Sequence, residues 1–175
     1  DVYKRQVDAA AVVTRNGIDD IEERTATHTV TTGSGEGTVF GGLMDEVDAI
    51  SLPADARLKQ STLYKIIETI RVHRSVYKQA GSLHSCALFA ADGTLIHFFE
   101  DVGRHNAVDA IAGKMWLDGM SGADKIFYTT GRLTSEMVMK GAQMGIPFLL
   151  SRSGATQMGH MAVSYTHLTL PTNRE

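Results

Sequence analysis

A strand–helix–strand pattern in residues 125–150 constrains the fold most. An apolar segment at residues 125–130 (KIFYTT) precedes a helical pattern over residues 134–144, and a second apolar strand follows at residues 146–150 (IPFLL). A helix between two such strands returns the chain to the end where the first strand began, so the strands pair in parallel. The pattern predicts an α/β fold, in which ligands commonly bind at the carboxyl ends of the strands.

A β-hairpin is predicted just upstream. Residues 85–90 (SCALFA) and 94–99 (TLIHFF) flank an Asp92-Gly93 pair, and Asp-Gly between two apolar runs is a strong hairpin signal. Apolar residues fall mostly on one face over residues 61–79, which predicts an amphipathic helix that ends near Gly81. A further helix is expected over residues 106–117.

The N-terminal part contains one more strand signal. Residues 27–32 (THTVTT) alternate β-branched side chains and run into residues 33–37 (GSGEG), which are too rich in glycine for the interior of a helix or strand. We expect a strand followed by a flexible loop.

With 175 residues, the chain suits one domain. Residues 1–6 (DVYKRQ) and 164–175 (SYTHLTLPTNRE) do not continue the periodicity of their neighbours. We expect both ends to be non-native, which leaves a single domain at residues 7–163.

Charge and composition narrow the function classes. No apolar run reaches the roughly 20 residues of a membrane-spanning helix, and the net charge of −3 with scattered basic residues argues against nucleic acid as a partner. The single cysteine, Cys86, has no intramolecular disulfide partner. A reducing compartment, the cytoplasm, is therefore predicted.

Three polar junctions each follow a strand and precede a helix, at residues 100–106, 131–135 and 151–156. Backbone N–H groups at a helix start attract anions, and Arg104, Arg132 and Arg152 each add a guanidinium near such a start. The pattern favours a ligand that carries phosphate. The alternative is that the polar residues only cap the helices.

The first junction is the densest in hydrogen-bonding groups. His105 can exchange a proton near neutral pH, Asp101 is placed to orient it, and His84 just before the hairpin can face the same crevice. A capping and salt-bridge role is the alternative for these residues.

Other site types lack their ligands. The chain has no Cys-x-x-Cys segment of a zinc deaminase, no Walker loop and no Gly-x-Gly-x-x-Gly turn. A metal-dependent hydrolase remains only if His84, His105 and His160 converge, so we expect no zinc.

Several motifs in order resemble the formate dehydrogenase accessory sulfurtransferase (FdhD) family. They are EDVGRHNAVD at residues 100–109, TGRLTSEMV at residues 130–138 and GIP at residues 145–147, with GSLHSCA at residues 81–87 and the segment from residue 151 onward. The resemblance covers about residues 27–163. It implies a cytidine-deaminase-like three-layer α/β sandwich, with a mixed sheet and an N-terminal β segment but without the deaminase zinc.

The resemblance also implies a function in molybdenum cofactor maturation. Members of the family take sulfur as a persulfide from a cysteine desulfurase and pass it to a bis-molybdopterin guanine dinucleotide destined for formate dehydrogenase, and they are expected to be homodimers. By resemblance, the cofactor would lie against His84, Asp101, Arg104, His105, Asn106, Gly131, Arg132 and Ser153.

The chain departs from the family at the catalytic position. The family's glycine-rich loop carries a cysteine, and Ser34 stands at that position here, with Gly37 where a second cysteine often follows. A serine hydroxyl has no persulfide chemistry. Cys86 is the only thiol, and its place in an apolar strand predicts a buried, structural role rather than a sulfur relay.

Two interpretations follow. The chain is a sulfurtransferase homologue, inactive where Ser34 replaces the cysteine, or it is a protein that binds or delivers the cofactor or a guanine nucleotide without sulfur chemistry. The family's Gly-Phe-x-Arg segment, expected after residues 157–163, is also missing.

Overall fold

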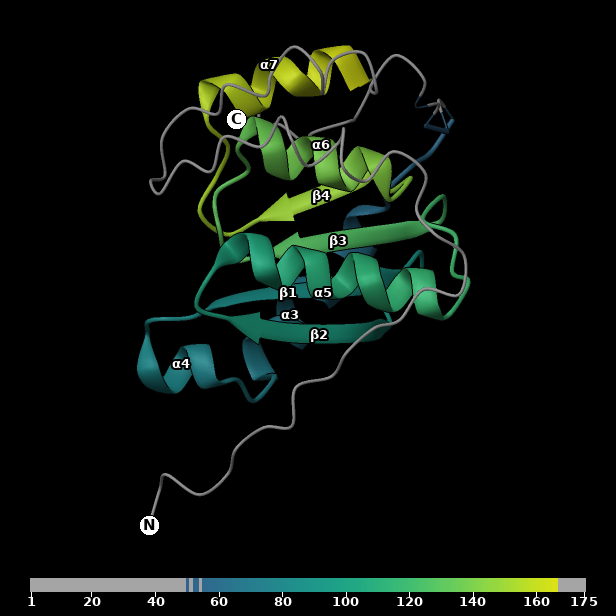
Figure 1. Ribbon diagram of the computed structural model, residues 1–175. Helices are drawn as coiled ribbons and strands as arrows, with labels where there is room; N and C mark the ends of the chain where they lie inside the picture. The colour runs from purple at the N-terminus through teal and green to yellow at the C-terminus, as the bar shows by residue number, and fades with distance from the viewer. Residues whose placement is uncertain (1–49, 51, 54, 167–175) are drawn as a thin grey trace, which may run out of the picture. The chain divides into compact units, whose positions relative to one another are not determined.

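The computed structural model describes residues 50, 52–53 and 55–166 of the protein. This part has a mixed α/β architecture (Figure 1), which confirms the predicted class. Its elements are α3 (Gln60–Val72), α4 (Val76–Ala80), β1 (His84–Ala90), β2 (Leu95–Asp101), α5 (Arg104–Leu117), β3 (Lys125–Thr129), α6 (Ser135–Gln143), β4 (Phe148–Ser151) and α7 (Gln157–Thr166). The strand and loop expected at residues 27–37, Ser34 included, lie outside the described residues.

The strands form one mixed sheet in the order β2-β1-β3-β4. The β1–β2 pair is the predicted hairpin, β1 is also antiparallel to β3, and β3 and β4 pair in parallel as the strand–helix–strand pattern requires. It follows that β2, β3 and β4 all run in the same direction. Their carboxyl ends meet at one edge of the sheet, which we call the carboxyl edge.

Helices cover both faces of the sheet. Cys86 and Leu88 of β1 face a core that includes buried residues of α5, α6 and α7, whereas Ala87 and Phe89 face a second core that includes Ile66 of α3. Figure 1 shows α5 and α6 on the near side of the sheet and α3 behind it. This alternation is the period of two expected for a strand buried on both faces.

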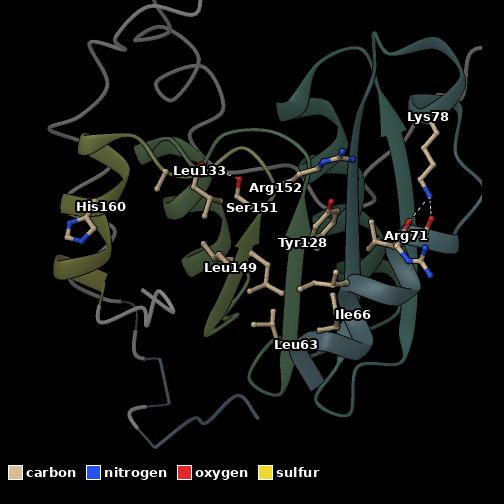
Figure 2. Close-up of a pocket in the computed structure, with 15 residues that line it drawn as sticks. Leu63, Ile66, Arg71, Lys78, Tyr128, Leu133, Leu149, Ser151, Arg152 and His160 are labelled. Carbon is tan, nitrogen blue, oxygen red and sulfur yellow. Dashed lines mark hydrogen bonds between the residues drawn. The ribbon is translucent and has the colours of Figure 1, made fainter. Parts of the chain in front are cut away.

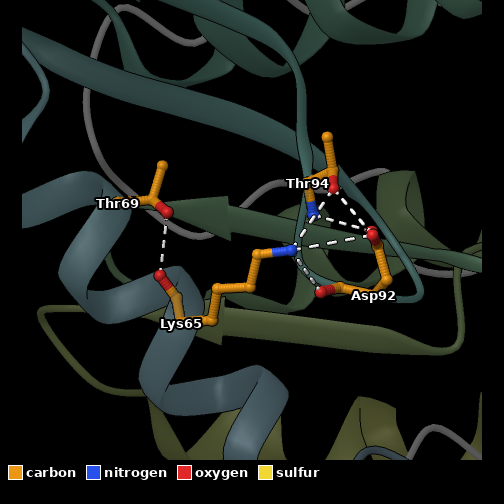
Figure 3. Close-up of polar contacts among 4 residues, drawn as sticks. All are labelled: Lys65, Thr69, Asp92 and Thr94. Atoms are coloured by element: carbon orange, nitrogen blue, oxygen red, sulfur yellow. Dashed lines mark hydrogen bonds and ion pairs between the residues drawn. The ribbon is translucent and has the colours of Figure 1, made fainter.

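The hairpin turn is joined to α3 by Lys65 (Figure 3). Its ammonium donates to the Asp92 carbonyl at 2.9 Å and to the Thr94 hydroxyl at 3.3 Å, while the Asp92 carboxylate accepts from the Thr94 N–H at 2.9 Å. Gly93 has φ +80°, which favours glycine, and it is buried against Thr62 and Lys65. The Asp-Gly pair therefore sets both the turn and its contact with α3.

The single helix predicted over residues 61–79 is wrong, because the chain forms two helices with a break at residues 73–75. The Lys78 ammonium donates to the carbonyls of Ile70, Arg71 and His73 at distances between 2.6 and 2.8 Å. These carbonyls lie at the end of α3, where helices leave carbonyl groups without intrahelical partners. Lys78 thus stabilises the end of α3 from the following helix.

The start of α4 is fixed by two side chains. The Ser75 hydroxyl accepts from the Lys78 N–H at 3.3 Å, and the Glu100 carboxylate of β2 accepts from the Val76 and Tyr77 N–H groups at 2.8 and 2.9 Å. Glu100 is distant in sequence, so the amphipathic pattern alone gave no sign of the break.

The last described helix, α7, continues through Thr166, three residues past the expected domain boundary at Val163. Within the described part of the chain, no helix is both long and apolar enough to cross a bilayer.

Candidate anion-binding site at the carboxyl edge

The three polar junctions lie side by side at the carboxyl edge. The strand register pairs His84 with Asp101, Cys86 with Thr129, and Thr129 with Ser151. The ends of β3 and β4 are therefore neighbours, and the start of β1 lies between the ends of β2 and β3. The helices α5, α6 and α7 each follow one of these ends. The convergence expected from the sequence is therefore present.

The second and third junctions are bonded to each other. Leu133 N–H donates to the Gly154 carbonyl and Thr156 N–H donates to the Leu133 carbonyl, both at 3.0 Å. The Ser153 hydroxyl donates to the Thr130 carbonyl at 2.7 Å. Ser153 was expected at the cofactor site, but its hydroxyl donates to the protein backbone and not to a ligand.

Two residues of the first junction shape its turn. The Asp101 carboxylate accepts from the Gly103 N–H at 2.7 Å and from the Asn106 amide at 2.9 Å, and these two hydrogen bonds, the Gly103 bond foremost, hold the pKa of Asp101 below its usual range. Asp101 was expected to orient His105. The alternative, a capping role, fits better, because its carboxylate accepts from the Gly103 N–H and the Asn106 amide of its own turn.

Glu136 is the carboxylate that contacts His105. Its Oε2 lies 3.2 Å from His105 Nε2, across the gap between the first turns of α6 and α5. Burial, and then the charge of Arg104, lower the pKa of His105, while Glu136 opposes the shift. Glu136 was not predicted as a site residue, although its position directly after the second junction indicated that it could lie there.

The starts of α5 and α6 have no side-chain caps. Neither N-cap residue, Gly103 or Thr134, makes a side-chain capping hydrogen bond. The third helix differs, since the Thr156 hydroxyl accepts from the Gly159 N–H at 3.1 Å. First-turn N–H groups without a capping partner attract negative charge. Of the three helix starts, those of α5 and α6 are therefore the ones without a side-chain cap.

Buried polar atoms without partners gather at the same edge. His84 Nδ1, Arg104 Nε and Thr134 Oγ1 are buried and have no hydrogen-bond partner among the described residues. Such atoms are rare, and each calls for an explanation such as a ligand. Arg104 also packs against Gly131, where an added Cβ would lie 3.1 Å from the Arg104 Cβ. Gly131 therefore leaves room for the arginine.

The other two arginines are placed differently. Arg132 is exposed. The Arg152 guanidinium lies 5.9 Å from the centre of the Tyr77 ring, toward α4. Of the three expected guanidinium groups, Arg104 alone contributes a buried, unpartnered donor to the described part of the carboxyl edge.

A separate groove of about 820 Å³ lies over β3 and β4, between α3 and α7 (Figure 2). Its described lining is mainly aliphatic, including Leu63, Ile66 and Leu149, and the groove extends from Arg71 and Lys78 to His160 of α7. It reaches the third junction at Ser151 and Arg152 but does not include Arg104 or His105. No pattern in the sequence predicted this groove.

His84, His105 and His160 do not converge. No three His, Cys, Asp or Glu side chains of the described residues are grouped so that they could hold a metal ion. Nothing in this part of the chain thus supports the metal-dependent hydrolase interpretation.

Cys86 is buried, as expected. It has 0% exposure, its Sγ lies 3.4 Å from the Thr129 hydroxyl, and burial raises its pKa to about 12. A thiol in this state is a poor nucleophile at neutral pH.

We therefore expect iodoacetamide to leave Cys86 unmodified in the folded protein at pH 8 and to modify it fully in urea, as followed by mass spectrometry. Because the folded-state pKa is raised, the stability that the neutral thiol contributes is present below the unfolded pKa and is lost as pH rises toward 12. Rapid alkylation of the native protein would contradict the burial.

Comparison with known proteins identifies the family. The model of the FdhD/NarQ family matches residues 1–172. The chain belongs to the FdhD/NarQ family. Proteins named sulfur carrier protein FdhD are similar to it: one from Saccharolobus solfataricus is 37% identical over 68% of this chain and 47% of its own length. One from Burkholderia mallei is 32% identical over 59% of this chain and 38% of its own length.

A solved structure is also similar. The crystal structure described as a formate dehydrogenase accessory protein from Desulfotalea psychrophila matches with a TM-score of 0.62 and 34% identity, over 70% of this chain and 52% of that chain. The chain spans about half the length of these FdhD relatives or less.

Proposed function

We propose that this chain is a sulfur carrier scaffold for molybdenum cofactor maturation. In this proposal it acts in the cytoplasm as a homodimer, accepting sulfur from a cysteine desulfurase and passing it to a bis-molybdopterin guanine dinucleotide destined for formate dehydrogenase. Its relatives' names support the carrier role. The cytidine-deaminase-like sandwich with an N-terminal β segment is part of the same proposal.

The observation that carries the proposal is the pair of helix starts at the carboxyl edge. The cofactor, as a substrate, presents phosphate groups, and α5 and α6 offer first-turn N–H groups without side-chain caps. Arg104 and Thr134 add buried donors there that have no partner in the part of the chain that the structure describes. These residues fit a phosphate group, and Gly131 keeps the arginine close to the second junction.

Sulfur transfer itself needs a thiol that the chain lacks at the family's position. In a persulfide relay, a thiolate attacks the outer sulfur of the donor persulfide, the S–S bond breaks, and the donor leaves as a thiolate. Ser34 has no such reactivity, and Cys86 is buried. In this proposal the chain still binds the cofactor, and sulfur transfer is expected to require the substitution Ser34→Cys.

The second candidate function is binding or delivery of the cofactor, or of a guanine nucleotide, without sulfur chemistry. The observation that favours it is the same lack of a reactive thiol, because the only cysteine has 0% exposure.

GDP binding tests the site. We expect Arg104→Ala to weaken GDP binding about tenfold or more, as loss of a charge-assisted hydrogen bond does. The control is Arg152→Ala, which removes a guanidinium that lies against Tyr77 instead. Isothermal titration calorimetry measures both. Equal GDP affinity in wild type and Arg104→Ala would refute a phosphate site at α5.

A further inference from the structure

Two ion pairs join α5 to α6. His105 Nε2 lies 3.2 Å from Glu136 Oε2, and one turn further along both helices the Lys140 ammonium lies 2.6 Å from Asp109 Oδ1. The two pairs have opposite polarity. In the first pair α5 contributes the imidazole and α6 the carboxylate, whereas in the second pair α5 contributes the carboxylate and α6 the ammonium. The two helices are therefore held side by side by matched pairs at i and i+4.

The His105–Glu136 pair lies at the candidate phosphate position. His105 is the second residue of α5 and Glu136 is the second residue of α6. Each therefore lies two residues after an N-cap, Gly103 or Thr134, that makes no side-chain capping bond. Arg104 directly precedes His105, and Thr134 lies two residues before Glu136; the buried Nε of Arg104 and Oγ1 of Thr134 have no partner among the described residues. The imidazole is partly open, with 30% of its side chain exposed.

We infer that Glu136 is a positioning residue that holds His105 as a phosphate-linked proton site, so that His105 takes up one proton from solvent when a phosphate group binds between the starts of α5 and α6. The inference rests on the proposed function, because it requires phosphate at that position. With Nε2 directed to Glu136, the imidazolium keeps a carboxylate partner on one nitrogen while the new positive charge stabilises the bound anion.

The charges around His105 determine the direction of the linkage. Arg104 and Asp109 face it from α5, and Glu136 and Lys140 face it from α6; burial and Arg104 lower its pKa, and Lys140 lowers it further, whereas Glu136 and Asp109 raise it. The free protein therefore favours the neutral imidazole at pH 7. A phosphate dianion nearby favours the charged form, so the pKa of His105 rises on binding. By linkage, affinity rises as pH falls through the interval between the two pKa values.

A purely structural role for the His105–Glu136 pair predicts a different pH dependence of binding. If the pair only holds α5 against α6, the loss of either ion pair loosens the same helix contact and weakens binding without moving its pH dependence. Lys140 supplies the matched control: Lys140→Gln removes one of the two interhelical pairs, as Glu136→Gln does, but it removes a charge of the opposite sign near His105.

The test is the GDP affinity of the full chain between pH 5.5 and 8.5, measured by calorimetry for wild type, His105→Gln, Glu136→Gln and Lys140→Gln. Ionisation of GDP itself contributes equally to all four. We expect wild type to gain up to tenfold in affinity per pH unit over His105→Gln within the linked interval, as uptake of one proton requires. Glu136→Gln moves that interval to lower pH, and Lys140→Gln moves it to higher pH.

Identical pH profiles for wild type and His105→Gln, with GDP binding still lost in Arg104→Ala, would overturn the inference and leave the proposed function standing. So would a profile that shifts in the same direction in Glu136→Gln and Lys140→Gln. Absence of GDP binding by wild type at every pH would overturn both.

Discussion

Gly159→Ala is expected to destabilise the protein by about 3 kcal/mol, at the upper end of what overpacking costs. An added Cβ at Gly159 would lie 2.2 Å from the Leu133 carbonyl oxygen and 3.1 Å from the Leu133 carbonyl carbon. Both are backbone atoms, and the same oxygen accepts the Thr156 N–H that joins the second and third junctions. Relief of the clash must move α7 or separate the junctions.

The measurement is the free energy of unfolding in urea. Gly113→Ala is the matched control, since Gly113 is also helical but has open space around its Cβ position. We expect that substitution to stabilise α5 by up to about 1 kcal/mol through helix propensity. A Gly159→Ala protein as stable as wild type would show that α7 does not approach Leu133 this closely.

Glu100→Ala is expected to cost about 3 kcal/mol, because its carboxylate accepts three hydrogen bonds and charge-assisted bonds are the strong ones. The donors are the Val76 N–H, the Tyr77 N–H and the Ser85 hydroxyl, at 2.8, 2.9 and 2.9 Å. Loss of the carboxylate leaves α4 without its tie to β2 and leaves the buried Ser85 hydroxyl without this partner.

The pH dependence of stability gives a second signature of Glu100. Burial raises its pKa, but the hydrogen bonds from Tyr77, Val76 and Ser85 outweigh burial and hold the pKa below its usual value. A lowered folded-state pKa means that the stabilisation is present above the unfolded pKa and is lost as pH falls through the folded one. The difference in unfolding free energy between wild type and Glu100→Ala should thus shrink in acid.

Glu68→Ala is the control carboxylate, because Glu68 forms an exposed pair with Arg71 on α3. Such solvent-exposed pairs contribute little to stability, so we expect Glu68→Ala to leave the free energy of unfolding nearly unchanged. If Glu68→Ala and Glu100→Ala cost the same, Glu100 does not fix α4.

Features set by local sequence were predicted correctly. The Asp92-Gly93 turn, the strands beside it and the parallel pair of β3 and β4 depend on turn chemistry and on hydrophobic period within a few residues. The convergence of the three junctions followed from the topology, since strands running in one direction end at one edge.

Features set by distant residues were missed. The break between α3 and α4 depends on Glu100 of β2, and the partner of His105 comes from α6 rather than from the adjacent Asp101. Arg152 is turned toward Tyr77, which lies 75 positions earlier in the sequence. Each depends on packing between elements, which periodicity and spacing do not encode.

The most direct test of a carrier scaffold without its thiol is transfer of labelled sulfur from a cysteine desulfurase to the purified wild type, to Ser34→Cys and to Ser34→Cys combined with Cys86→Ala. We expect background labelling of wild type and about one labelled sulfur per chain in both variants, which a reductant removes as it does a persulfide. Labelling of wild type at Cys86 would contradict the proposal that the chain lacks a reactive thiol. Absence of labelling in both variants would contradict the proposal that the chain is a carrier scaffold.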